Sequence, residues 1–180
     1  MILGENIRLR AIEREDIPRF VRWMNDPEVT EFLLINSPLS RVMEEQWFER
    51  QAATPPHEGQ VLAIEIQENG EWVHIGNTGI HNVEPVHREA EFGIVIGEKP
   101  YWNRGFGRKA TELMLKHGFE HLNLNRIYLN VYEDNVRGFK AYQAAGFIQE
   151  GVLREAVYKN GEYINVIIMS VLHSEWKKRK

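Results

Sequence analysis

Two glycines, Gly105 and Gly107, stand between an apolar stretch that ends in Ile94-Val95-Ile96 and a helical pattern that begins at Arg108. Backbone N–H groups at the start of a helix have no partner within the helix, and they lie at the positive end of its dipole. A phosphate group binds there readily if no side chain blocks its approach. The segment therefore predicts a phosphate-binding loop, with an ordinary glycine-containing turn as the alternative.

The predicted loop consists of Asn103, Arg104, Gly105, Phe106, Gly107, Arg108 and Lys109. We expect its backbone to be the main ligand, so that Trp102→Gln, just before the loop, should be tolerated. A Walker loop requires G-x-x-x-x-G-K-[ST], which is absent, and a dinucleotide fingerprint needs a third glycine where Ala110 stands. No parallel strand with an acidic ribose ligand follows at the right distance, which disfavours NAD.

Apolar residues recur with alternating strand and helix periods along the whole chain. The periods predict strands at 6–11, 60–68, 72–83, 90–96 and 126–131, helices at 13–24, after Pro38, at 108–121 and at 135–145, and two final strands that meet at Asn160-Gly161. Ser40 is the expected cap of the second helix, and residues 28–39 are expected to form a mobile connector. The order predicts one α/β domain, residues 1–180, with a mixed sheet.

Composition narrows the function classes. The absence of cysteine excludes disulfides, zinc–thiolate sites and a cysteine acyl-enzyme. The net charge of -4 disfavours nucleic-acid binding and suits a cationic partner. No apolar stretch is long enough to span a membrane, and the first residues lack a secretion signal, so a cytoplasmic location is expected. No metal site is evident among the seven histidines.

A second segment, residues 135–147, carries polar groups on a predicted helix. Asn135 and Tyr142 are seven residues apart, nearly two turns, and therefore share a helix face with Gly138 and Phe139. A thin ligand along this face would meet Asn135 through its amides, approach closely at Gly138 and end near the Tyr142 hydroxyl. The alternative makes Asn135 a helix cap and Tyr142 a core aromatic.

Together the two segments resemble the GNAT superfamily of N-acetyltransferases. Its Q/R-x-x-G-x-G/A motif opens the coenzyme-binding helix, and its N-x-x-A-x-x-x-Y-x-x-x-G-F motif marks the next helix. Here Trp102 replaces Gln or Arg, and Gly138 replaces Ala. The resemblance implies acetyl-CoA as cosubstrate, no metal, and a mixed, mostly antiparallel seven-stranded sheet flanked by about four helices.

Other stretches resemble particular branches of that superfamily. Residues 7–10 and 23–29 are similar to the RimJ/RimL branch, which acetylates ribosomal-protein N-termini. Ala90-Glu91-Phe92 and residues 160–163 are similar to bacterial spermidine acetyltransferases. The implied acceptor is a primary amine: a protein N-terminus, a polyamine, an amino sugar or another small amine.

Acetyl transfer to an amine needs a base, an oxyanion donor and an acid for the departing thiolate. The resemblance implies that the backbone of Ile94, Val95 and Ile96 splays from the next strand, pairs with pantetheine and offers an N–H to the thioester oxygen. It also implies that Tyr142 protonates the sulfur. The ordinary tyrosine pKa of about 10 lies above that of a thiol, so Tyr142 would carry its proton at neutral pH.

Several residues are candidates for the general base and for contacts with the acceptor. Glu91 is the first candidate for the base, because spermidine acetyltransferases carry an acid at the matching position. Alternatively, Glu91 lies with Glu89 on a solvated face of the strand and has no catalytic role. Glu31 and His81 are further candidates. Residues 30–35, including Phe32, and the closing hairpin are expected to bound the acceptor, so Glu31, Phe32, His81 and Glu91 are the predicted acceptor contacts.

Two further possibilities stay open at this point. The chain is either an enzyme or a silent acetyl-CoA-binding sensor or interaction module, and the presence of both Asn135 and Tyr142 favours the enzyme. A homodimer formed through the terminal strands is compatible with either function.

Overall fold

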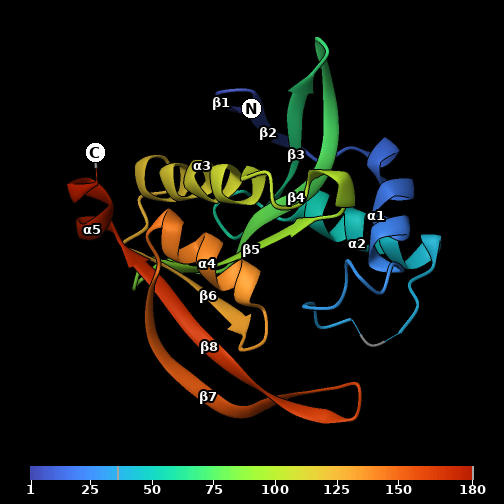
Figure 1. Ribbon diagram of the computed structural model, residues 1–180. Helices are drawn as coiled ribbons and strands as arrows, with labels where there is room; N and C mark the ends of the chain where they lie inside the picture. Colours follow the sequence, from blue (N-terminus) through green and yellow to red (C-terminus); the bar gives the residue numbers. More distant parts are fainter. Residues whose placement is uncertain (36, 180) are drawn as a thin grey trace.

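The computed structural model describes residues 1–35 and 37–179, and its strands form one sheet (Figure 1). The strand order is β1-β2-β3-β4-β5-β6-β8-β7, and every neighbouring pair is antiparallel except β5 with β6. The strands are β1 (Ile2–Gly4), β2 (Ile7–Ala11), β3 (Gln60–Glu68), β4 (Glu71–Glu84), β5 (Glu89–Ile96), β6 (Arg126–Tyr132), β7 (Ile148–Lys159) and β8 (Glu162–Leu172).

Five α-helices and two short 3-10 helices accompany the sheet in the described residues. They are η1 (Arg14–Asp16), α1 (Ile17–Met24), α2 (Arg41–Ala53), η2 (Lys99–Tyr101), α3 (Phe106–Glu120), α4 (Val136–Ala145) and α5 (His173–Lys178). The Ser40 side chain caps α2 by accepting from the Met43 N–H at 3.2 Å, as predicted. None of the described helices is long and apolar enough to cross a membrane.

The predicted mixed and mostly antiparallel sheet is confirmed, but the expected count of seven strands is corrected to eight. The added strand, β1, has only three residues, too few for a periodic signal, and it exists because it pairs with β2. The six-residue α5 was missed for the same reason. Residues 28–39, the predicted mobile connector, hold neither helix nor strand where they are described, and Asn36 lies outside the described residues.

Alternate residues of β5 serve two hydrophobic clusters on opposite faces of the sheet. Ile94 and Ile96 pack with the main cluster, to which α3 contributes Met114 and Leu115. Val95 packs with the second cluster, formed by α1, α2 and the segment after α1. In Figure 1, α3 and α4 accordingly lie apart from α1 and α2. The β5 strand therefore passes between two differently covered faces.

A buried ionic network attaches α1 to the sheet. Arg10 donates to Asp16 at 2.7 and 2.9 Å and to Glu65 at 2.7 Å, and His74 Nδ1 lies 3.0 Å from Asp16. Burial by itself would raise the pKa of Asp16, but hydrogen bonds with Arg10 and His74 bring it well below its ordinary value. His74 Nε2 lies 3.0 Å from the Asn77 side-chain oxygen. The network thereby fixes the orientation of Asn77 on β4.

Candidate functional site

Two cavities meet at the middle of β5, where the sheet opens. The parallel pairing of β5 with β6 ends at Glu91 and Tyr128, although both strands continue. Residues 92–96 pair only with β4. A larger cavity of about 530 Å³ and a smaller one of about 340 Å³ share Gly93, Ile94 and Val95 in their linings. The expected divergence at Ile94, Val95 and Ile96 is thus present, and it connects the two faces of the sheet.

The start of α3 forms one wall of the larger cavity. Its cap, Gly105, has a left-handed φ of 81°, and a Cβ at this position would meet nothing within 4 Å. The first hydrogen bond inside the helix runs from the Lys109 N–H to the Gly105 carbonyl at 3.1 Å. The preceding N–H groups therefore have no partner within the helix and lie at its positive end. This arrangement suits a phosphate group.

The cationic side chains of the loop contribute unequally. Arg104 lies over the Tyr101 ring, 5.1 Å from its centroid, and 3.9 Å from Glu68, outside the cavity lining. Lys109 is also outside the lining. Arg108 lines the cavity, while its Nε donates to Glu112. The predicted loop residues that line the larger cavity are Asn103, Gly105, Phe106, Gly107 and Arg108.

Arg137 and Lys140 on α4 add positive charge that the sequence analysis missed. Both residues line the larger cavity. The guanidinium of Arg137 lies over the ring of Trp102, whose indole nitrogen donates to the Ile96 carbonyl at 2.7 Å. Arg137 occupies a variable position of the family motif, so only its spacing from Asn135 offered a signal.

Asn135 acts as a helix cap and also lines the larger cavity. Its side-chain oxygen accepts from the Gly138 N–H at 2.9 Å. A Cβ at Gly138 would lie 2.7 Å from the Asn135 side-chain nitrogen. A Cβ there would crowd the capping amide, and Gly138 also lines the larger cavity, where we expected a ligand to approach closely.

Tyr142 faces the larger cavity from the same helix. Its ring packs edge-on against Phe92 and Phe147, with centroids 6.2 and 6.0 Å away. No group among residues 1–35 and 37–179 hydrogen-bonds to its hydroxyl. Burial raises the pKa of Tyr142 to about 12. The phenol therefore keeps its proton at neutral pH.

Glu91 lies at the point where β5 leaves β6 and lines the larger cavity. Asn82 donates to one of its oxygens at 2.8 Å and Asn130 to the other at 3.0 Å. Glu89 lies on the same strand face, as expected, and is paired with Arg126 at 2.9 Å. The two acids therefore differ, because Glu91 has amide partners and Glu89 has a cationic one.

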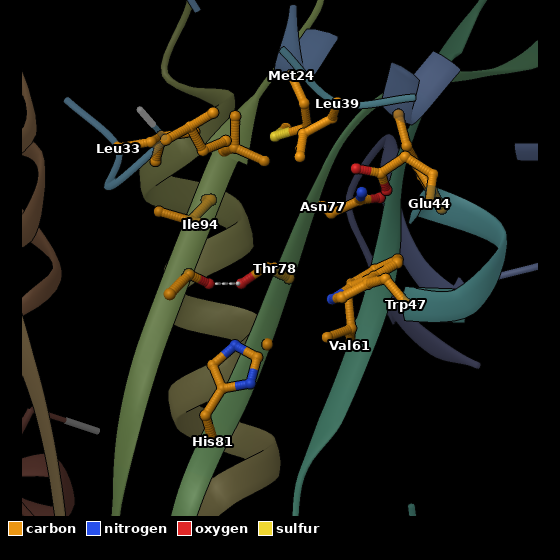
Figure 2. A pocket seen from close by; sticks show the side chains of 15 residues that line it. Met24, Leu33, Leu39, Glu44, Trp47, Val61, Asn77, Thr78, His81 and Ile94 are labelled. Atoms are coloured by element: carbon orange, nitrogen blue, oxygen red, sulfur yellow. Dashed lines mark hydrogen bonds between the residues drawn. The ribbon is translucent and has the colours of Figure 1, made fainter. Parts of the chain in front are cut away.

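The smaller cavity lies between β4, β5 and the α1–α2 side, and its walls are mainly apolar (Figure 2). His81 lines it, and burial lowers the pKa of this imidazole, although the charge of Glu91 partly opposes the shift. Glu44, Trp47 and Asn77 also line it, and the sequence analysis missed all three. Two adjacent acids on a helix, Glu44 and Glu45, are typical of a solvated surface.

The two remaining predicted acceptor contacts, Phe32 and Glu31, differ in whether they line a cavity. Phe32 lines the larger cavity, whereas Glu31 is exposed and lines neither. The described residues contain no group of three or more His, Asp or Glu side chains placed to hold a metal.

Comparison with known proteins agrees with this geometry. Residues 6–148 match the family model described as an acetyltransferase (GNAT) domain. The chain is 30% identical to p20, an uncharacterised N-acetyltransferase of Bacillus licheniformis, over 96% of each chain. It is also 30% identical to the putative ribosomal N-acetyltransferase YdaF of Bacillus subtilis, over 58% of this chain and 57% of that protein.

A solved structure resembles the whole chain. It is the crystal structure of spermidine N-acetyltransferase from Vibrio cholerae in complex with CoA and spermine, with a TM-score of 0.87 and 27% identity over 97% of this chain and 99% of that one. The family match, the relatives and the fold agree with one another. The chain belongs to the GNAT family of acetyltransferases and is an acetyl-CoA-dependent N-acetyltransferase.

Proposed function

We propose that the larger cavity holds acetyl-CoA and that the smaller cavity admits a primary amine, so that the acetyl group passes directly between them. The observation that carries this proposal is the junction at Gly93, Ile94 and Val95, which line both cavities. Reactants bound in the two cavities would meet at this junction, because β5 and β6 are no longer paired beyond Glu91 and the sheet is open there. Such positioning is worth up to roughly 7–11 kcal/mol of the barrier.

Each end of the larger cavity has a proposed role. The N–H groups at the start of α3, with Arg108 and Arg137, bind the phosphates, and Asn103 and Phe106 complete the wall. The unpaired side of Ile94, Val95 and Ile96 binds the pantetheine amides and donates an N–H to the thioester oxygen. Asn135 and Tyr142 bound the opposite side.

The proposed chemistry moves two protons from nitrogen and one to sulfur. Glu91, directly or through water, takes a proton from the acceptor ammonium. The nitrogen then attacks the thioester carbonyl, the carbon–sulfur bond breaks, and the Tyr142 hydroxyl protonates the departing thiolate. The amide nitrogen loses its second proton, which restores the tyrosine. His81, with its lowered pKa, is neutral at pH 7 and is the second candidate for the base.

The acceptor is proposed to be a small primary amine, and spermidine is a first compound to test because of the Vibrio cholerae relative. A thiol-release assay with acetyl-CoA identifies the acceptor among polyamines, amino sugars and peptides with free N-termini. Thiol release that depends on the amine supports the proposal. Equal thiol release with and without each small amine would refute this class of acceptor.

The proposed homodimer rests on one edge of the sheet. Strand β7 is a terminal strand of the order, and Ile148, Val152 and Leu153 on it are exposed. Sedimentation at micromolar concentration tests it, with Val152→Lys as the disrupting variant. A monomeric wild type would refute this assembly without affecting the catalytic proposal.

A further inference from the structure

A buried carboxyl without a partner faces the smaller cavity. Glu44, on α2, is only 6% exposed and lines this cavity. Within the described residues, its carboxyl takes part in no hydrogen bond or ion pair. The other buried acids differ: Asp16 is paired with Arg10, and Glu65 with Arg8 and Arg10.

The environment of Glu44 disfavours an unpaired charge. Burial raises the pKa of this carboxyl, with no compensating hydrogen bond. Buried carboxylates are normally paired, because an isolated one loses its hydration without gaining a partner. A ligand that supplies a cation would remove this penalty, and an unpaired buried acid in a cavity is a candidate for such a role.

The cavity walls suit a cation with an apolar body. Its lining among residues 1–35 and 37–179 includes no Lys or Arg, so no described cationic side chain neutralises Glu44 there. The rings of Phe20 and Trp47 lie edge to face with centroids 5.5 Å apart, and Met24 and Leu39 extend the apolar surface. Aromatic rings attract cations when water is excluded.

The position of Glu44 separates it from the proposed base. Figure 2 shows its carboxyl directed toward Asn77, away from His81 at the other end of the group. Asn77 pairs in register with Val95, at the junction of the cavities. A molecule that places one nitrogen at this junction can therefore place a second charged group against Glu44 within the same cavity.

We propose that Glu44 determines acceptor specificity by binding the second cationic nitrogen of a small diamine-like substrate whose first nitrogen is acetylated at the junction. This inference rests on the proposed function. It predicts a preference for an acceptor with two cationic ends and an apolar spacer over an amine of equal length with a neutral or anionic end.

Three acceptors with four carbon atoms each test the preference: 1,4-diaminobutane, n-butylamine and 4-aminobutanoate. For the wild type, kcat/KM for the diamine should exceed that for butylamine by about 10- to 100-fold, the range expected for a charged hydrogen-bonded pair. In Glu44→Gln this ratio should fall to within about threefold, mainly through a higher KM for the diamine. Glu45→Gln is the matched control, because Glu45 pairs with Arg41 at 2.9 Å and lines neither cavity.

Binding measurements keep the test independent of turnover. With coenzyme A present, calorimetry should show that 1,4-diaminobutane binds the wild type and Glu45→Gln equally and Glu44→Gln at least about 10-fold more weakly. Glu44→Asp, which retains the charge, serves if the glutamine variant does not fold, and it should keep part of the preference. A diamine preference that survives in Glu44→Gln, or is absent in the wild type, overturns the inference. Absence of thiol release with every amine refutes the proposed function instead, and the binding arm still decides the role of Glu44.

Discussion

The guanidinium carbon of Arg137 lies 4.3 Å from the centroid of the Trp102 ring, and Trp102 in turn donates to the Ile96 carbonyl. This contact joins the start of α4, the segment before α3 and the end of β5. Three walls of the larger cavity are therefore held together by one aromatic side chain, at the position where the family motif has Gln or Arg.

Replacing Trp102 should weaken coenzyme A binding, contrary to our expectation from the sequence that Trp102→Gln is tolerated. A cation–π contact of about 0.5–2 kcal/mol corresponds to a two- to roughly 30-fold rise in Kd, measured by calorimetry. Trp102→Phe keeps an aromatic ring beneath Arg137 and should therefore lose less affinity for coenzyme A than Trp102→Gln. Trp72→Gln is the control, since Trp72 makes the same kind of contact with Arg8 at 4.3 Å but lines neither cavity. Equal affinities for wild type and Trp102→Gln would restore the original expectation.

Gly105→Val should weaken coenzyme A binding by about 10-fold or more, because N–H donors to a phosphate are each worth roughly 1.5–3 kcal/mol. The open space beside Gly105 excludes a steric clash within the protein, so the effect comes from the left-handed backbone and from the blocked approach. Gly161→Val is a matched control, with a φ of 89° and open space at the β7–β8 turn. Both variants should lose stability, but only the first should lose affinity. A similar Kd for the two variants would remove the phosphate-loop assignment.

Tyr142→Phe should lower kcat by about 100- to 10,000-fold while the Kd of acetyl-CoA changes little. The raised pKa of Tyr142, about 12, keeps the wild-type phenol protonated across the assay range, so its ionisation should produce no alkaline limb below pH 10. Tyr101→Phe is the comparison, because the Tyr101 hydroxyl donates to Glu68 at 2.7 Å. Loss of this hydrogen bond should reduce the free energy of unfolding by about 0.5–1.5 kcal/mol without a comparable loss of kcat. Full turnover by Tyr142→Phe on a confirmed acceptor would contradict the acid role.

Lys159→Met should disorder the segment between α1 and α2 and raise the acceptor KM. The Lys159 ammonium is buried and donates to the carbonyls of Thr30 and Leu33, both at 2.6 Å. Methionine fills similar space but leaves both carbonyls without this donor, at a cost of about 1–3 kcal/mol. Hydrogen exchange should accelerate at residues 28–35, with coenzyme affinity unchanged. Lys177→Met, on α5, is the exposed control, and unchanged exchange in Lys159→Met would show that other contacts hold the segment.

The free energy of unfolding should contain a contribution from His117 that falls as the pH drops below about 6.5. Burial lowers the pKa of His117, with smaller effects from His121 and the N-terminus, and its Nε2 has no partner in the described structure. The unfolded chain therefore takes up a proton that the folded chain resists. Urea titrations of wild type and His117→Gln at pH 7.5, 6.5 and 5.5 measure the contribution of His117 as a difference between the two proteins. The effect of Glu44 cancels in this difference; its raised pKa would make the free energy of unfolding increase as the pH falls. If the difference in free energy of unfolding between wild type and His117→Gln does not change with pH, the proposed contribution of His117 is excluded.

Local patterns were sufficient for much of the fold and part of the site. The glycines at 105 and 107 predicted the helix start and its free N–H groups, because both depend on residues close together in sequence. Alternation in residues 90–96 predicted β5, and the seven-residue spacing of Asn135 and Tyr142 predicted that both face one cavity. The short β1 escaped because three residues have no periodicity without the partner strand.

Contacts between distant segments were decided only by the tertiary structure. Lys159 reaches carbonyls 129 and 126 residues away, and Arg137 meets Trp102 only because α4 packs beside α3. Glu44 appears in the sequence as one of two ordinary helix acids. In the folded chain, where α2 packs against α1, Glu44 is buried and Glu45 pairs with Arg41. Sequence determines which groups a short segment can present, whereas burial and pairing depend on which distant surface covers them.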